Sequence, residues 1–383
     1  MGMTRWLAGQ LFEDTTRSGK LAAMDGVRGV AVLTVFLSHS SGRDQAVAPW
    51  LAFNGIGHIG VYLFVVLSGF LLAHTLLRRR QSAGEFYLRR FFRIFPLYAL
   101  VVSIVFIVQQ STGVLDARYL HVKDGALGWL RHLVFLQGDS LFWTIAAEFQ
   151  FYFVMPFIVA ALVRWGRPAV IISAVIAVAY GAWYLAIVHH LLPASAALKI
   201  ARIAHAGQFV DVFLCGVLAA YAYESAAVAG WFASERRWLE PTLAALAFAV
   251  AGISLAGVSD RFLWFHRPSY GVRDYSIVYG AVFAVLLLAT LYDYRPFGRL
   301  LMNGLLRLAG VIAFGWYLLH FPIFESLNRI TAGTRFDVGP LKFVISFFLC
   351  IAAGIASYLL VEKPCIQLSK RLLQRRASAP VLA

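Results

Sequence analysis

Charged residues are scarce in this sequence. Asp, Glu, Lys and Arg make up 14% of its 383 residues, against 60% hydrophobic residues, whereas a soluble domain carries about 25% charged residues. One water-soluble core cannot enclose so much apolar surface, which excludes a soluble enzyme, a disordered regulator and a fibrous protein. Apolar runs of about 20 residues recur along most of the chain and predict a polytopic membrane protein.

Cysteine is also rare, and several site motifs are missing. The three cysteines, Cys215, Cys350 and Cys365, are far apart in the sequence and form no CxxC pair. This excludes a disulfide framework and a zinc–thiolate site, and we predict no bound metal. Phosphate-binding loops, GxGxxG after a strand and HExxH are all absent. Residues 1–20 lack an apolar segment before a small-residue cleavage site, so we expect no cleavable signal peptide.

Positive charge, in contrast, is in excess, with a net charge of +15. No RNA- or DNA-binding motif accompanies it, so we predict no nucleic-acid partner. Basic residues in loops instead set membrane topology and meet anionic lipid. Lys and Arg are concentrated in one set of alternate loops, which includes the run Arg78–Arg80. This bias predicts that both termini are cytoplasmic.

The hydrophobic runs predict an all-α fold with ten membrane-spanning helices. Their ranges are 21–41, 55–77, 94–111, 141–163, 168–189, 203–223, 240–258, 274–292, 303–323 and 340–361. The connections are short, and no internal repeat is visible. The sequence therefore predicts a cytoplasmic segment over 1–20, a ten-span domain over 21–365 and a basic cytoplasmic tail over 366–383.

Ionisable residues inside the spans are candidates for a functional site, because each costs about 2.5–3.5 kcal/mol at the bilayer centre. Arg28 and His39 both lie in the first span, and their spacing puts both side chains on one helix face, about 16 Å apart along the axis. The pattern predicts two positions on one cavity wall. The alternative is that Arg28 extends toward the membrane surface and His39 lies at the interface.

Glu148 in the fourth span and His320 in the ninth are predicted at the depth of His39, near the outer surface. An imidazole held by a carboxylate can act as a general base, so we expect His39 and Glu148 to lie together. Structural alternatives exist for the other two residues. Glu148 could hydrogen-bond a neighbouring span, and His320 could face the interface.

A basic and aromatic block, FYLRRFFRIFPLY, lies on the predicted cytoplasmic side at residues 86–98. Arginine forks suit phosphate oxygens, and aromatic rings can stack on a purine. Arg89, Arg90, Arg93 and Tyr87 are therefore predicted to bind a nucleotide-bearing molecule. The alternative is that these arginines act only as topology signals.

Six motifs together are similar to those of the acyltransferase-3 family of membrane O-acyltransferases. They are MDGVRGVAVLTVFLSH, GVYLFVVLSGFLLAHTLLRR, FYLRRFFRIFPLY, FWTIAAEFQFYFVMPF, GWYLLHFPIF and VEKP, and they cover residues 20–365 in the order of the family. The resemblance implies that an acyl group, usually acetyl, moves from cytoplasmic acyl-CoA to a sugar hydroxyl exposed outside the bacterial inner membrane. One departure is Thr144-Ile145 after Trp143, where the family usually has Ser-Leu.

The resemblance also implies roles for individual residues. Arg28 and His39 take the signature positions of the family and Glu148 the acidic one, and we predict that these three are catalytic. Acetyl-CoA or another acyl-CoA is predicted to bind Arg89, Arg90, Arg93 and Tyr87, and the acceptor to contact Trp143, Tyr317 and His320. Two mechanisms stay open: His39 deprotonates the acceptor, or it carries the acyl group transiently.

Two other functions are weighed against this one. A secondary transporter would use the intramembrane residues as a proton relay, but its halves usually show an internal repeat. A membrane glycosyltransferase would need acidic residues for a metal-bound nucleotide sugar, and the basic block has few beside it. The sequence thus favours an acyltransferase.

Overall fold

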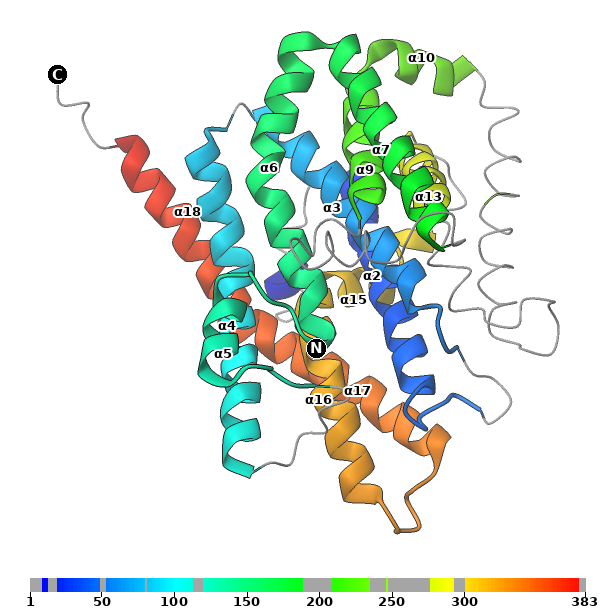
Figure 1. Ribbon diagram of the computed structural model, residues 1–383, viewed down its shortest axis with the longest axis vertical. Coiled ribbons are helices and arrows are strands. Elements are labelled where there is room, and N and C mark those ends of the chain that lie inside the picture. The colour runs from blue at the N-terminus through cyan, green and yellow to red at the C-terminus, as the bar shows by residue number, and fades with distance from the viewer. Residues whose placement is uncertain are drawn as a thin grey trace.

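The computed structural model describes residues 9–12, 19–48, 53–79, 81–112, 120–188, 209–234, 246, 276–292 and 300–378. In these residues the regular elements are helices (Figure 1), which confirms the all-α prediction for this part of the chain. The helices are α2 (Gly19–Ser41), α3 (Gly57–Arg79), α4 (Ala83–Thr112), α5 (Gly125–Leu133), α6 (Trp143–Trp165), α7 (Arg167–Val188), α9 (Val210–Tyr223), α10 (Ala226–Ser234), α13 (Ser276–Leu291), α15 (Gly304–Val311), α16 (Ala313–Thr331), α17 (Gly339–Ser357) and α18 (Lys363–Ser378).

Nine of the ten predicted spans coincide with helices in the described part of the chain. The tenth, 240–258, lies outside it except for Leu246. Five helical stretches among the described residues are long and apolar enough to cross a membrane, and a sixth is counted if α15 and α16 form one span. The apolar helices α9 and α13 are shorter, with 14 and 16 residues. The protein is therefore a multi-pass membrane protein by its helices, but a total of ten spans is not confirmed.

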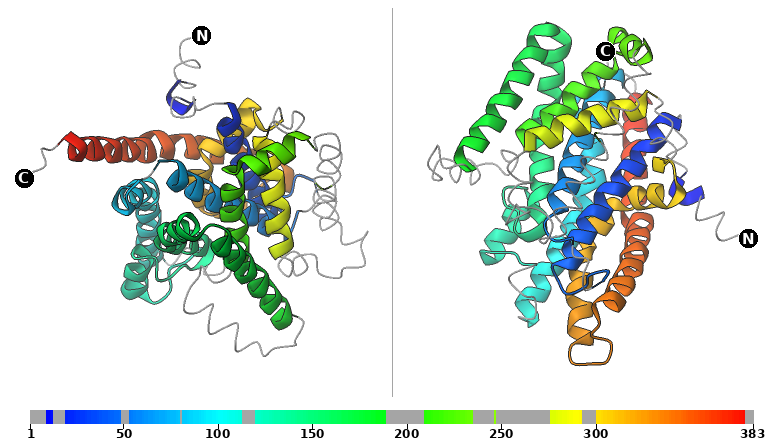
Figure 2. Two further views of the ribbon diagram at one scale, coloured as in Figure 1. Left: turned by 90° about the horizontal axis from the view of Figure 1, so that it is seen from above. Right: turned by 90° about the vertical axis from the view of Figure 1, so that its right-hand side faces the viewer.

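The helix connections alternate between the two ends of the bundle. The α3–α4 and α6–α7 connections share one end, at the top of Figure 1, and the α16–α17 turn lies at the other. Residues 366–378 of the predicted tail belong to α18, which packs along α4 and projects sideways from the bundle (Figure 2). The assignment of the α3–α4 end to the cytoplasm remains a prediction from the charge bias.

The predicted span over 303–323 is not one straight helix. It divides at the buried Ile312 into α15 and α16, whose axes differ by 77°. The Asn303 side chain begins α15 by accepting a hydrogen bond from the Leu305 backbone N–H at 2.9 Å, as N-terminal caps do. The bend turns α15 against α2, where it forms one of the most extensive helix contacts of the bundle.

Glycines allow α2 and α15 to touch backbone to backbone. A Cβ atom at Gly310 would lie 1.7 Å from the Asp25 carbonyl oxygen, and one at Gly29 would lie 2.0 Å from the Leu306 carbonyl oxygen. Small residues permit this close approach in membrane helix pairs. The contact fixes the stretch of α2 that carries Asp25 and Arg28.

The first prediction concerns this contact. Gly310→Ala is expected to lower the free energy of unfolding by about 1–3 kcal/mol, the usual cost of overpacking, because the added methyl group has only backbone atoms to displace. The matched control is Gly304→Ala at the start of the same helix, where an added Cβ meets no atom within 4 Å. Thermal unfolding of the two variants in detergent checks this, and equal midpoints would contradict the packing account.

Candidate functional site

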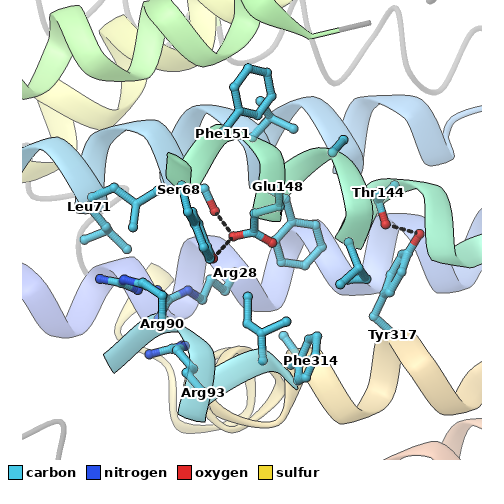
Figure 3. A pocket seen from close by; sticks show the side chains of 18 of the residues that line it. Arg28, Ser68, Leu71, Arg90, Arg93, Thr144, Glu148, Phe151, Phe314 and Tyr317 are labelled. Atoms are coloured by element: carbon cyan, nitrogen blue, oxygen red, sulfur yellow. Dashed lines mark hydrogen bonds between the residues drawn. The ribbon is translucent and has the colours of Figure 1, made fainter. Parts of the chain in front are cut away.

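A central cavity lies where α2, α3, α4, α6 and α16 meet (Figure 3). It offers about 130 Å³ to water-sized molecules. Its wall is mostly apolar but carries a cluster of polar side chains: Arg28, Ser68, Arg90, Arg93, Thr144, Glu148, Tyr152, Tyr317 and Glu362. The cavity therefore combines three cations and two carboxylates inside a helical membrane bundle.

A second, basic cavity of about 220 Å³ adjoins the first. The two spaces share seven wall residues, among them Arg28, Arg90 and Arg93. The wall of the basic cavity carries five cationic side chains, from Arg28, Arg89, Arg90, Arg93 and Lys370, but only two carboxylates, from Asp25 and Glu362. The arginine cluster thus joins a strongly positive space to a deeper and more apolar one.

Glu148 is held in the central cavity by two hydroxyl groups. Its Oε1 atom accepts hydrogen bonds from Ser68 Oγ at 2.6 Å and from the Tyr152 hydroxyl at 2.7 Å (Figure 3). Glu148 and Tyr152 are four residues apart on α6, so both side chains lie on one face of that helix. Ser68 comes from the neighbouring helix α3. Glu148 lines the same cavity as Arg28, Arg90 and Arg93.

Arg28 is oriented by its own helix. Its Nη1 atom donates to Asp25 Oδ1 at 3.1 Å, one turn earlier on α2. The bond leaves the rest of the guanidinium fork directed to the two cavities, whose walls both include Arg28. Sequence spacing placed Arg28 on a cavity wall, and the structure places it there together with Arg90 and Arg93.

Glu362 also lines both cavities, and no role was predicted for it. It ends a π-helical turn, Tyr358–Glu362, between α17 and α18. Such turns insert one extra residue and redirect the following side chains. Glu362 is 5% exposed, and its Oε1 atom has no hydrogen-bond partner among the described residues. The signal that could have predicted Glu362 is its position in the VEKP motif, as a single carboxylate at the end of an apolar run.

His39 is not close to Glu148, contrary to the expected imidazole–carboxylate pair. Its Nδ1 atom lies 2.9 Å from His320 Nε2, and His39 is absent from the walls of both cavities. Glu148 instead accepts from Ser68 and Tyr152, so the two side chains have different neighbours. His39 and Arg28 therefore share one helix but not one cavity.

Tyr317 separates the central cavity from the histidine pair. Its hydroxyl accepts from Thr144 Oγ1 at 2.8 Å and donates to the Leu141 carbonyl at 3.1 Å. Its ring contacts His320, with centroids 5.6 Å apart. A single layer of side chains, the Thr144–Tyr317 barrier, thus stands between the cavity and the imidazoles.

The remaining predicted residues lie at other positions. Trp143 stacks on Phe209, with centroids 5.2 Å apart, and Tyr87 packs against α6 and donates to the Phe153 carbonyl at 2.9 Å. Neither belongs to the wall of either cavity, whereas Arg89 lines the basic one. His320 is 1% exposed, and both of its ring nitrogens have hydrogen-bond partners. Among the described residues, no three His, Cys, Asp or Glu side chains gather as metal ligands do.

Comparisons with known proteins identify the family. The family model Acyl_transf_3, an acyltransferase domain, matches residues 21–359. Nodulation protein 10 of Rhizobium leguminosarum bv. viciae is 25% identical over 94% of this chain and 97% of its own length. O-acetyltransferase OatA of Staphylococcus aureus is 22% identical over 90% of this chain, which spans 57% of OatA. Peptidoglycan O-acetyltransferase OatA of Listeria monocytogenes is 27% identical over 42% of this chain and 28% of its own length. No solved structure matches the chain significantly.

A pair of tyrosines tests how Glu148 is held. Tyr152→Phe removes a buried hydrogen bond to a carboxylate and is expected to cost about 1.5–3 kcal/mol of stability, whereas Tyr87→Phe removes an exposed bond to a carbonyl and is expected to cost about 1 kcal/mol or less. Denaturant unfolding in detergent measures both. If Tyr152→Phe proves no more costly than Tyr87→Phe, the carboxylate is not held as described.

Proposed function

The chain belongs to the acyltransferase-3 family and is an acyltransferase, and we propose that it moves an acetyl group from cytoplasmic acetyl-CoA to a hydroxyl of a sugar-containing acceptor outside the membrane. Because the chain belongs to this family, an acyltransferase is favoured over the secondary transporter. The observation that carries the proposal is the arginine cluster of Arg28, Arg90 and Arg93, which joins a basic cavity to a deeper apolar one. The relatives are bacterial proteins, and the inner membrane is the proposed location.

The basic cavity suits the nucleotide end of acetyl-CoA. That end carries three phosphate groups, and guanidinium groups bind phosphate oxygens in two-pronged fashion. Arg89 and Lys370 lie on the wall of the basic cavity only, whereas Arg28, Arg90 and Arg93 reach both spaces. The apolar walls of the central cavity suit the pantetheine arm, so the thioester would point toward the Thr144–Tyr317 barrier.

The acceptor is proposed to be a sugar hydroxyl on the far side of that barrier. Support comes from the OatA relatives, which are O-acetyltransferases, one of them named for peptidoglycan. His39 lies on this side, near the end of α2 that is predicted to face outward. The donor and acceptor would therefore enter from opposite ends and meet at Tyr317.

The reaction needs a base that deprotonates the acceptor. We propose that His39 Nε2 takes the proton of the acceptor hydroxyl while the hydroxyl oxygen attacks the thioester carbonyl carbon. The carbon–sulfur bond then breaks, and the CoA thiolate leaves on the donor side and takes up a proton. Since Tyr317 lines the cavity and its ring contacts His320, the partner of His39, we propose that its side chain moves aside during transfer.

Glycan analysis tests the function itself. Envelope glycans from cells with and without the gene are compared by mass spectrometry, and the gene is expected to add acetyl groups. His39→Ala should insert normally in the membrane but abolish the acetylation. Unchanged O-acetylation without the gene would contradict the function. Normal acetylation by His39→Ala would show that His39 is not the base.

Arg93 tests the donor site. Arg93→Gln removes one charged phosphate contact and is expected to raise the KM for acetyl-CoA about tenfold, since such bonds contribute about 1.5–3 kcal/mol. Acetyl-pantetheine lacks the nucleotide and its phosphates, so its KM should hardly change in the same variant. Arg131→Gln is the control, because Arg131 is exposed on α5 and lines neither cavity. An equal rise with both donors would contradict a phosphate-binding role.

Tyr317 tests the barrier. Tyr317→Ala is expected to open the central cavity to water from the acceptor side, so that acetyl-CoA hydrolysis without acceptor rises roughly tenfold. Tyr317→Phe keeps the ring and should stay close to the wild-type hydrolysis rate. The release of free CoA by reconstituted protein measures this, and a rate unchanged in Tyr317→Ala would show that the barrier lies elsewhere.

A further inference from the structure

The histidine pair has one polar contact that fixes its protons. His320 Nδ1 lies 2.5 Å from the Tyr317 carbonyl oxygen, one turn earlier on α16. A carbonyl oxygen only accepts hydrogen bonds, so Nδ1 carries the hydrogen. In a neutral imidazole the other nitrogen then has a free lone pair. His320 Nε2 is therefore an acceptor.

The position of the hydrogen on His320 also determines its position on His39. His320 Nε2 lies 2.9 Å from His39 Nδ1, and the two rings are parallel to within 2°. Because His320 Nε2 accepts, His39 Nδ1 must donate, which leaves the lone pair of neutral His39 on Nε2. The backbone of α16 thus selects the tautomer of a residue on α2.

The surroundings favour the neutral pair. His320 is buried among the rings of Tyr317, Phe321 and Phe324, and burial of an unpaired charge is costly. A positive charge already lies beside the pair, because Arg43 Nη1 donates to the His39 carbonyl oxygen at 3.0 Å and its guanidinium lies 3.8 Å from the centroid of the Phe321 ring. Both influences oppose a second positive charge at the resting pair.

The nitrogen of His39 that carries the lone pair lies beside a residue without a side chain. A Cβ atom built at Gly57, at the start of α3, would lie 3.7 Å from Nε2, which is an ordinary van der Waals contact. His39 is partly exposed, unlike His320. Of the two imidazoles, His39 is therefore the one that is not fully enclosed.

We propose that His320 is a positioning residue, which holds His39 in the tautomer whose Nε2 accepts the proton of the acceptor hydroxyl. This inference rests on the proposed function. In the transfer, the hydroxyl proton moves to His39 Nε2, the hydroxyl oxygen forms the new ester bond, and the carbon–sulfur bond of the thioester breaks. The imidazolium formed at His39 shares its Nδ1 proton with His320 Nε2, which stabilises the charge while it exists. The carbonyl of Tyr317 has the role that a carboxylate has in other histidine-containing sites.

Two substitutions of His320 separate this role from a packing role. The Oε1 atom of Gln can take the place of Nε2 and accept from His39, so His320→Gln should keep kcat within about tenfold of wild type. His320→Leu offers no acceptor and should lower kcat by roughly 100-fold or more, the range of a lost general base, with little change in either KM. Equal losses in both variants at equal thermal stability would overturn the positioning role.

Nitrogen NMR reads the tautomer without any activity. In protein labelled with 15N-histidine, the His39 signals are identified by their loss in His39→Gln. The expected spectrum shows a protonated Nδ1 and an unprotonated Nε2 at His39, and a mixture of tautomers in His320→Leu. A protonated Nε2 in the wild-type protein would overturn the proposal. Absence of acetyl transfer by the wild-type protein would instead overturn the proposed function, and the spectrum would still decide whether His320 fixes the tautomer.

Discussion

The gathering of three arginines around a cavity inside an apolar bundle is the constraint on which the site depends. Each ionised side chain costs about 2.5–3.5 kcal/mol or more at membrane depth, and Arg28, Arg90 and Arg93 meet around one cavity. Several separate features offset this cost. Glycine contacts bring α15 against α2 beside Asp25 and Arg28, two hydroxyls hold Glu148, and a π-helical turn brings Glu362 to the same space. The proposed binding of an anionic donor explains why the cluster is present despite this cost.

The charged side chains and the imidazoles lie in different parts of the molecule. The arginines and carboxylates gather around the two adjoining cavities, whereas the imidazoles lie beyond the Thr144–Tyr317 barrier. Asp25 pairs with Arg28, Glu148 accepts from two hydroxyl groups, and a backbone carbonyl, not Glu148, orients the histidines. Tyr317 connects the two levels, because its ring contacts His320, its hydroxyl bonds Thr144, and its carbonyl accepts from His320. In the proposed reaction, the acetyl group crosses the molecule at this residue.

Hydrophobic runs predicted the long apolar helices of the described residues, and the expense of charge in a membrane pointed to Arg28. The basic and aromatic composition of residues 86–98 pointed to Arg90 and Arg93. The predictions that failed depended on quantities outside the reach of periodicity. Equal predicted depth suggested that His39 and Glu148 meet, but the structure pairs His39 with His320 and holds Glu148 with two hydroxyl groups. The 77° bend in the apolar run over 303–323 was not predicted, although Gly310 lies two residues before the break at Ile312. Glu362 was missed because a π-helical turn, invisible in a hydropathy pattern, decides its direction.

Sidedness of the donor is the most direct test of this account. Right-side-out membrane vesicles are loaded with radiolabelled acetyl-CoA, which does not cross a bilayer, and are given an accessible glycan acceptor on the outside. In a second set the same donor is supplied only outside. The account predicts that label reaches the external acceptor from internal acetyl-CoA alone. Equal labelling from external acetyl-CoA would contradict a donor cavity that opens to the cytoplasm and a transfer that passes Tyr317.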